Sequence, residues 1–401
     1  MSHGIRWVGL DVHARESTIA VFDQATGEVS TRRVVGRPHQ LLAWLMEIPV
    51  PARMVYEAGP TGYGLARRAW AEGIEMVVCA PSRTDRRPGD RVKTDKRDAI
   101  RLARLLAAGE LTLVVVPTVE QEQLRDLVRC RDDIRGDLMR ARHRLGKFLL
   151  RREISYDGKA RAWTHRHRAW LSSLRLADRA SQLTFEDYLH SHDVLAARRD
   201  RIEVELAELA GGSPWQETIA RLRCLRGIDT LSALGLCAEV GRFDRFAHPD
   251  SLAAYLGIVP SEHTSGQTRR QGSITKAGST HARRLLIEAA YHYQRHPAVS
   301  IDLERRQRGQ SAGVIDVAWR AQRRLHSRWR QLKQTRHKPN GVVAVAVAVA
   351  RESAAFCWEI ATIRAPSGHG SAGIHASGRP PLAGTLRPTE ASATSAAGGR
   401  P

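Results

Sequence analysis

A repeat of apolar residues between Leu124 and Phe148 restricts the fold more than any other pattern in the chain. Apolar residues at alternating steps of three and four line one face of a long helix, and that face needs a second helix to cover it. A shorter repeat from Leu195 to Leu209 offers such a partner. We therefore predict an antiparallel coiled-coil hairpin that pairs residues 120–151 with 193–210, an ordinary amphipathic bundle being the alternative. The repeats comprise Leu124, Leu127, Arg131, Ile134, Leu138, Ala141, Leu145 and Phe148, with Arg131 as a charged interruption, and Leu195, Ile202, Leu206 and Leu209.

Short β-rich runs precede this repeat, and their order predicts an α/β domain. The first three runs follow one another without a helix between them, whereas helical spacing separates the later ones. This order indicates a mixed sheet flanked by helices. The expected strands are 7–12, 17–23, 28–35, 54–59 and 74–80, and the expected helices are 40–47, 62–72 and 95–107.

Composition divides the chain into four parts. Residues 1–118 form the α/β domain, and 119–213 form the helical hairpin. Residues 214–365 read as a mainly α-helical C-terminal domain, in which 222–246 resembles a helix, a glycine turn and a second helix. The tail 366–401 contains Gly, Ser, Ala, Pro and Thr with few large apolar residues, so we expect it to be disordered.

The charge balance favours a polyanionic partner. Lys and Arg number 63 against 42 Asp and Glu, which gives a net charge of +21 and a pI of about 10.8. The arginines are spread over several segments rather than gathered in one tail. Nucleic acid is therefore the favoured partner, ahead of a membrane-surface patch or a charge that serves solubility.

Cysteine usage and hydropathy indicate a cytoplasmic protein. The five cysteines form no C-x-x-C pair and their number is odd, which argues for a reducing compartment and against a structural zinc site. No signal peptide is recognised, and the apolar run 342–350 is shorter than the roughly 20 residues that cross a bilayer. We expect no membrane partner.

Two aspartates, Asp95 and Asp98, stand at the start of an expected helix in the basic segment KTDKRDAIRLARLL. Residues three apart on a helix share a face, so the two carboxylates can act together. The alternative is local: Asp95 is an N-cap, and Asp98 stabilises the positive end of the helix.

Asp11 and Glu57 strengthen the functional interpretation. Asp11 lies inside an expected strand, in GLDVH, and Glu57 ends another, in VYEAGPTG. Groups near strand ends converge in open sheets, and buried carboxylates are usually paired or metal-bound. Four acids can hold two Mg²⁺ ions about 4 Å apart, an arrangement that clamps the oxygens of a phosphate. The cations that would hold a nucleic-acid backbone beside them are Lys93, Lys96, Arg97 and Arg101.

A second polar cluster lies in segment 256–290, where Pro260 and Gly266 break regular structure. A serine becomes a nucleophile only with a base, a metal or a strong positive field, and a flexible cationic loop offers such a field. The alternative, which the residues alone favour, is a phosphate-binding loop whose serines only form hydrogen bonds, or a helix N-cap at Ser279. The serines are Ser265, Ser273 and Ser279, and the cations are Arg269, Arg270, Lys276, Arg283 and Arg284.

Five blocks in order resemble one family. They are GLDVH, YEAGPTGYGLAR, VKTDKRDAIRLARLL, LRGIDTLSALGLCAEVGRF and LAAYLGIVPSEHTSGQTRRQGSITKAGSTHARRLLIEAA. Their order, with a D-x-x-D helix followed by SG and G-x-I-T-K-x-G, resembles the one-ten family of DEDD-type insertion-sequence transposases, which are bridge-RNA-guided recombinases. The resemblance covers roughly the first 120 residues and the stretch 222–361.

The resemblance implies a fold and a set of roles. The fold is an α/β RNase H-like (RuvC-type) N-terminal domain, a helical coiled-coil insertion, and a mainly α-helical C-terminal transposase domain with a helix-hairpin-helix-like segment and a serine loop. The family's members exchange DNA strands. The matching residues are Asp11, Glu57, Asp95 and Asp98 as catalytic, metal-binding acids, Ser265 as the nucleophile, and Ser279 as the second choice for it.

The resemblance also implies cofactors and partners. They are Mg²⁺, with Mn²⁺ as a substitute, element-end and target DNA, a noncoding bridge RNA, and further copies of the chain in a dimer or tetramer at the bacterial nucleoid. Two alternatives stay open: a junction-resolving nuclease that uses water, and a non-catalytic nucleic-acid-binding protein. The residues expected to bind nucleic acid are Lys93, Lys96, Arg97, Arg269, Arg270, Lys276, Arg283 and Arg284.

Overall fold

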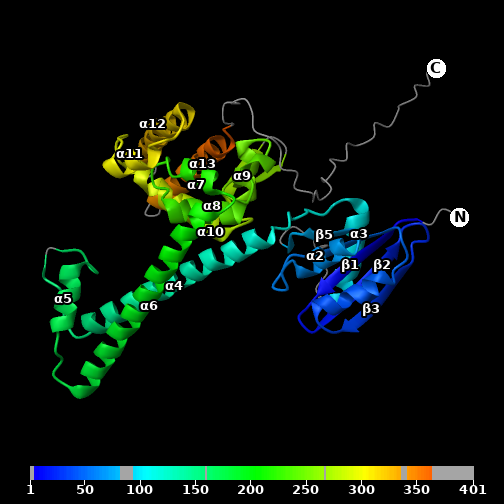
Figure 1. The fold of residues 1–401 in the computed structure, drawn as a ribbon, viewed down its shortest axis with the longest axis horizontal. Helices are drawn as coiled ribbons and strands as arrows, with labels where there is room; N and C mark the ends of the chain where they lie inside the picture. The colour runs from blue at the N-terminus through cyan, green and yellow to red at the C-terminus, as the bar shows by residue number, and fades with distance from the viewer. Residues whose placement is uncertain (1–3, 82–93, 159, 266–267, 336–340, 364–401) are drawn as a thin grey trace. The chain divides into compact units, whose positions relative to one another are not determined.

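The computed structural model of the chain covers most of its length (Figure 1). The expected disorder of the tail 366–401 lies outside the described residues. Side chains are described for all of these residues except 263–265, 268–271 and 335. The described residues are 4–81, 94–158, 160–265, 268–335 and 341–363.

A five-stranded mixed sheet forms the N-terminal part, as predicted. Its strands are β1 (Arg6–Val12), β2 (Glu16–Asp23), β3 (Val29–Val35), β4 (Ala52–Glu57) and β5 (Met76–Cys79). In the order β3-β2-β1-β4-β5, the first three strands are antiparallel, and β1, β4 and β5 are parallel. This order fits the expected α/β RNase H-like domain.

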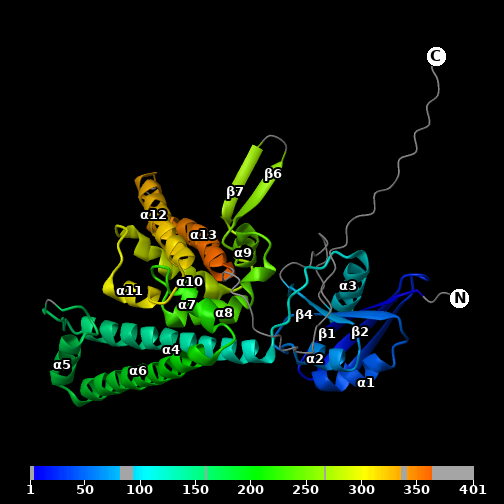
Figure 2. The ribbon, with the colours of Figure 1, turned by 45° about the horizontal axis from the view of Figure 1, so that its top comes forward.

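Helices cover both faces of this sheet (Figure 2). On one face, α1 (Leu41–Met46) and α2 (Gly64–Ala71) share a hydrophobic core with β1 and β4. On the other face, α3 (Asp95–Ala108) packs Leu102 against Val55 of β4. A single 3₁₀ turn, η1 (Pro38–Gln40), precedes α1.

Gly9 brings α3 into direct contact with the sheet. It lies in β1, and a Cβ atom there would stand 2.1 Å from the carbonyl oxygen of Ala99 and 2.5 Å from the backbone nitrogen of Ala103. A close-packed interior has no room for such an atom. Gly9 therefore sets the separation between β1, which carries one predicted acid, and α3, which carries two.

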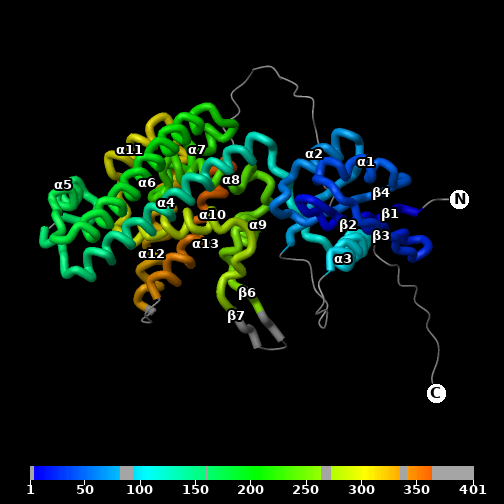
Figure 3. Tube along the Cα trace, turned by 90° about the horizontal axis from the view of Figure 1, so that it is seen from below, coloured from blue at the N-terminus to red at the C-terminus, as the bar shows by residue number. Residues whose placement is uncertain are grey.

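Two long helices run side by side in opposite directions, and a short helix lies where they turn (Figures 1 and 3). They are α4 (Val119–Leu150) and α6 (Arg179–Gly212), with α5 (His165–Ser173) between them in the chain. The charged interruption Arg131 donates from Nε to Oε1 of Glu203 on α6 at 2.7 Å.

The buried faces of the long helices differ from the predicted repeat at one end. Leu124, Leu138 and Leu145 of α4 are buried as expected. On α6, Leu209 is 48% exposed and Ala210 is buried in its place. The expected helices are present, and the knobs-into-holes packing of a coiled coil stays a prediction.

The C-terminal part is mainly helical, as predicted. Its helices enclose one large hydrophobic core together with parts of α4 and α6. They are α7 (Gln216–Leu222), α8 (Thr230–Val240), η3 (Phe243–Arg245), α9 (Pro249–Tyr255), α10 (Thr280–Ala290), η4 (Tyr291–Gln294), α11 (Ile301–Gln307), α12 (Ala312–Thr335) and α13 (Gly341–Thr362).

The segment expected to be a flexible serine loop forms a β-hairpin instead. Its strands, β6 (Pro260–Ser265) and β7 (Thr268–Ile274), pair antiparallel and stand out from the helices around α9 (Figure 2). The prediction was wrong here because the runs PSEHTS and TRRQGSI are polar and contain Pro and Gly, so they lack the usual signal of a strand.

Among the described residues, α13 alone has the length and composition of a membrane-crossing helix, with a hydropathy of 1.5 in its most apolar window. That window is 44% buried, and Val345, Val349 and Ile360 lie in the C-terminal core. Packing in this core accounts for the apolar composition of the helix.

Candidate active site

The two parallel strands β1 and β4 bring Asp11 and Glu57 to the same edge of the sheet. Leu10 pairs with Tyr56, and each acid follows its paired residue by one position. Asp11 lies inside a strand, as expected, and is the second-last residue of β1, which ends at Val12 before the turn into β2. The two acids therefore lie beside one another at the carboxyl ends of their strands.

The first turn of α3 presents Asp95 and Asp98 to this edge. Thr94 is the N-cap, since its Oγ1 accepts the backbone N–H of Arg97 at 3.4 Å. Asp95 is thus the first residue of the helix and not its cap, which removes the capping explanation for this acid.

One half of the site combines two carboxylates and an imidazole. Nε2 of His13 lies 3.4 Å from Oδ1 of Asp11 and 3.9 Å from Oδ1 of Asp95. One ligand atom from each of these residues lies within 4.8 Å of the others. The sequence did not single out His13, although it stands two positions after Asp11 in GLDVH, because its approach to Asp95 depends on the packing of α3.

The other half of the site holds a guanidinium. Nη2 of Arg101 lies 3.1 Å from Oδ1 of Asp98 and 3.9 Å from Oε1 of Glu57. Arg101 therefore bridges an acid of α3 and an acid of β4. It occupies a position between two carboxylates, where a cation is electrostatically favoured.

Mutual repulsion of the acids is visible at Asp11. Burial raises the pKa of its carboxyl group, and the negative charges of Asp95 and Asp98 raise it further, while His13 opposes the shift. Carboxylates that disfavour one another's charge are stabilised by a bound cation. The donors are carboxylate oxygens with one imidazole nitrogen, a set that fits Mg²⁺ or Mn²⁺.

Basic residues surround the start of α3. Lys96 and Arg97 are exposed in its first turn. Lys93 lies outside the described residues. The two described cations stand next to Asp95 in the chain, which suits contact with a phosphate backbone near the acids.

The hairpin carries the first candidate nucleophile at the end of a strand. Ser265 is the last residue of β6, and its backbone pairs with Thr268 of β7. Arg269 and Arg270 follow in β7, and Lys276 lies beyond the hairpin with a positive φ of 56°. The side chains of Ser265, Arg269 and Arg270 are not among those described.

The second candidate nucleophile has a structural role. Ser279 is the N-cap of α10, and its Oγ accepts the backbone N–H of Ala282 at 3.1 Å. This is the N-cap that the sequence offered as the alternative interpretation.

Two arginines expected to bind nucleic acid are bound by the protein itself. Arg283 is only 8% exposed, and its Nη1 donates to the carbonyl oxygens of Leu256, Ala277 and Gly278 at 3.1, 2.6 and 3.1 Å. Arg284 pairs with Asp132 of α4, and its Nη1 donates to Glu288 at 2.9 Å. These contacts fix the turn before α10 and connect α10 to α4.

An α/β domain with acids at its sheet edge is joined to a helical domain, and the comparisons with known proteins show that the chain is of the transposase class. Residues 8–152 match a family described as "Transposase", of DEDD type, and residues 219–303 match the "Transposase IS116/IS110/IS902 family". The chain is 39% identical over 360 residues to y4qE of Sinorhizobium fredii (strain NBRC 101917 / NGR234), which its name classes as a transposase, with 88% of each chain covered.

A second relative is the transposase for insertion sequence element IS1533 of Leptospira borgpetersenii. It is 33% identical over 342 residues, which cover 83% of this chain and 98% of the relative. The chain belongs to the IS110 family of transposases. Its substrate class is therefore DNA, and its general reaction is DNA cleavage and strand transfer.

Proposed function

We propose that the chain excises and inserts its own insertion sequence by DNA strand exchange, with divalent metal ions held at the acid cluster. The observation that carries the proposal is the convergence of Asp11, Asp95 and His13, with Glu57 and Asp98 beside them, at one edge of the sheet. Membership of a transposase family makes a scissile DNA phosphate the natural substrate for this cluster.

The residues proposed to hold Mg²⁺ or Mn²⁺ are the four acids, Asp11, Glu57, Asp95 and Asp98. Bound there, the ions would polarise the scissile phosphate and stabilise charge that develops on its oxygens. The acids would orient the ions, and His13 would add a nitrogen donor. Arg101 offsets the charge of Asp98 and Glu57 in the structure.

Ser265 is the proposed nucleophile. Its hydroxyl oxygen forms a bond to phosphorus, its proton passes to solvent or a nearby base, and the DNA oxygen on the far side of the phosphorus leaves with the free strand end. The resulting phosphoserine bond conserves the energy of the cut, so rejoining needs no ATP. The position of Ser265 at the end of a hairpin strand supports this assignment over Ser279, whose hydroxyl already caps α10.

Guidance by RNA and assembly of subunits complete the proposal. A bridge RNA would choose the DNA sequence by base pairing, while the protein contacts backbone and shape. Segments 120–151 and 193–210 would join subunits as a coiled coil and bind RNA through their arginines. In a tetramer at the nucleoid, acids and serine would come from different subunits. The proposed domains are 1–118, 119–213 and 214–365, followed by the tail 366–401.

The test is a search for protein-linked DNA. Purified protein is mixed with Mg²⁺, transcripts of the noncoding DNA that flanks the element, and labelled element-junction DNA, and the products are resolved on denaturing gels. We expect an adduct with the wild-type protein and with Ser279→Ala, and none with Ser265→Ala. If the adduct is lost only in Ser279→Ala, Ser279 and not Ser265 is the nucleophile. If DNA is cut and no variant forms an adduct, the nucleophile is water and not a serine.

A further inference from the structure

A pocket of about 590 Å³ lies against the acid cluster in the N-terminal domain. Its walls come from the end of β1 and the two residues after it, from η1 and the residue before it, and from α2 with the loop that leads into it. His13 belongs both to this pocket and to the group formed with Asp11 and Asp95. Whatever occupies the pocket therefore lies next to the position of the scissile phosphate in the proposed function.

The lining combines apolar surface with flat rings. Val12, Pro38 and Leu65 provide apolar surface, and the imidazoles of His13 and His39 provide two π-faces. Proteins that bind single-stranded nucleic acid stack bases on such rings, in a positively charged groove that follows the backbone. The volume suits one nucleotide, because pockets for ligands of this size enclose roughly 300–1,000 Å³.

The charge of the pocket is suited to phosphate. Arg37 and Arg68 line it, both are exposed, and neither side chain has an ion pair with another described residue. By contrast, the neighbouring Arg67 is bound by Glu122 at 2.6 Å and by the carbonyl oxygen of Pro117 at 2.8 Å. No carboxylate is among the described residues that line the pocket.

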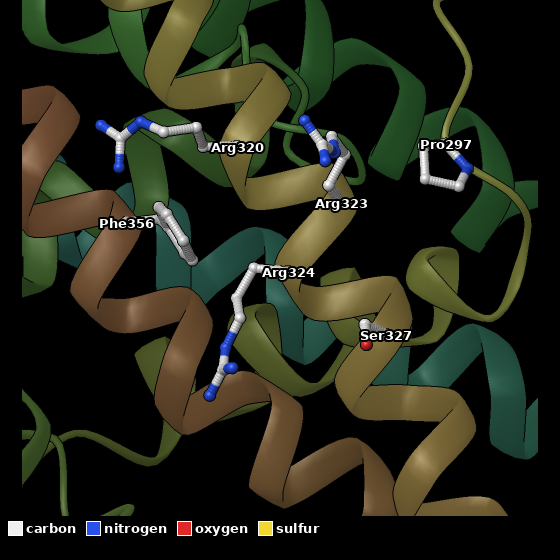
Figure 4. Close-up of a pocket in the computed structure, with 6 residues that line it drawn as sticks. All are labelled: Pro297, Arg320, Arg323, Arg324, Ser327 and Phe356. Carbon is white, nitrogen blue, oxygen red and sulfur yellow. The ribbon is translucent and has the colours of Figure 1, made fainter.

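A second arginine-lined hollow, on α12, differs in that two of its three arginines, Arg320 and Arg324, are paired with carboxylates (Figure 4). There, Arg320 donates to Glu359 at 2.5 Å and Arg324 donates to Glu352 at 2.9 Å. Both guanidinium groups are thus neutralised by carboxylates of α13. Of the two hollows, the one beside the acid cluster is the better phosphate site.

We propose that the pocket beside His13 receives one nucleotide of the DNA strand that is cut, immediately next to the scissile phosphate. Its base stacks on the imidazoles, and the following phosphate is held by Arg37 and Arg68. The inference rests on the proposed function, because that function makes DNA the strand at the acids. It adds a subsite that fixes where along the strand the cut falls.

The first test maps the contact. Element-junction DNA is made with 5-iododeoxyuridine at each position in turn around the cut, and ultraviolet crosslinks to the full-length protein are located by peptide mass spectrometry. We expect crosslinks to 37–39 or 60–68 from one or two adjacent positions beside the cut. If the protein cuts the junction but crosslinks form only outside these residues, the pocket does not bind the cut strand, and the proposed function is unaffected. If an iodouridine-labelled transcript crosslinks to the pocket and the labelled DNA does not, the pocket binds RNA, which also contradicts the inference.

The second test measures what the two arginines contribute. In the variant with both Arg37→Ala and Arg68→Ala, we expect the half-saturating junction DNA concentration to rise about tenfold and the maximal rate to stay within about twofold. The slope of log affinity against log salt should fall by about 0.7–0.9, because the contact to one phosphate is lost. The control is Arg53→Ala, at the opposite end of β4 and paired with Glu75 at 2.5 Å.

The outcomes of the second test separate the two proposals. If the double variant behaves like Arg53→Ala while both cut DNA, the subsite is wrong. If the wild-type protein crosslinks junction DNA through the pocket but never cuts it, the proposed function fails, and the pocket is a DNA contact without a scissile phosphate beside it. Equal melting temperatures of the three proteins ensure that the comparison concerns contacts and not folding.

Discussion

His13 gives the acid cluster a nitrogen donor, because its Nε2 lies 3.4 Å from Asp11 and 3.9 Å from Asp95. Nitrogen donors favour Mn²⁺ over Mg²⁺. We expect His13→Gln to weaken Mn²⁺ binding about tenfold, while Mg²⁺ binding changes by less than about threefold. Calorimetry measures both affinities, and pulsed EPR detects ¹⁴N coupling to bound Mn²⁺. The control is His39→Gln. A ¹⁴N coupling that persists in His13→Gln would contradict the role of this residue.

Gly9 determines whether α3 can reach the sheet, since a Cβ atom there would lie 2.1 Å from the carbonyl oxygen of Ala99. We expect Gly9→Ala to reduce the free energy of unfolding by about 2 kcal/mol through overpacking. Urea denaturation gives this value. Gly146→Ala, in α4 with nothing within 4 Å of the added atom, should instead stabilise the protein by about 0.5–1 kcal/mol. Equal effects of the two substitutions would be inconsistent with the close contact.

The helices α4 and α10 are joined through Asp132, whose Oδ2 lies 2.8 Å from Nδ1 of His281 and also contacts Arg284. Burial alone would raise the pKa of Asp132, but the hydrogen bond from His281 and the charge of Arg284 outweigh it, so the pKa is lowered. A lowered folded pKa stabilises the fold above the unfolded pKa of about 3.9, and this stabilisation is lost as the pH falls through the folded value.

We therefore expect Asp132→Asn to lower the free energy of unfolding by about 2 kcal/mol at pH 7, because the mostly buried guanidinium of Arg284 loses its partner. The cost should shrink steadily below pH 4. Unfolding curves measured between pH 3 and pH 7 follow this change. Asp133→Asn, at the next position of α4, serves as the control and should leave stability within about 0.5 kcal/mol at every pH. A cost that is constant with pH would rule out the ion pair as its cause.

The elements of the N-terminal domain could be predicted because each carries its own pattern. Strands such as STIAVFD are rich in β-branched and aromatic residues, and the apolar face of α3 repeats with helical spacing. The hairpin of β6 and β7 could not be predicted, because its strands are polar and are defined by pairing with each other. The four acids could be named from motif and resemblance. Arg101 was expected to contact nucleic acid, but its position between Asp98 and Glu57, like the approach of His13 to Asp95, depends on how α3 packs on the sheet.

The basic surface of the whole molecule determines how binding responds to salt. With a net charge of +21, the chain should contact DNA at many phosphates. We expect affinity for non-specific duplex DNA to fall by at least about 10³ between 50 and 200 mM salt, as for proteins that make six to ten such contacts. Fluorescence anisotropy across this range gives the slope. A change of less than tenfold would show that the charge serves solubility rather than DNA binding.

The distribution of function over the molecule also explains why no single segment identifies it. The acids come from β1, β4 and α3, whereas the candidate serine belongs to a hairpin more than one hundred and fifty positions later in the chain. The long helices α4 and α6 lie between them in sequence. In the proposed function, strand exchange needs both the acids for cutting and the serine for rejoining, so neither segment alone would predict it.

The most direct measurement is recombination of element-junction DNA by Asp95→Asn and Asp98→Asn in the presence of Mg²⁺ and the flanking transcript. These changes remove one negative charge each and keep the shape of the side chain. We predict that both variants lose recombination by at least about 10³-fold while they bind the transcript as the wild-type protein does. Full activity in either variant would contradict the assignment of the acid cluster as the metal-binding active site.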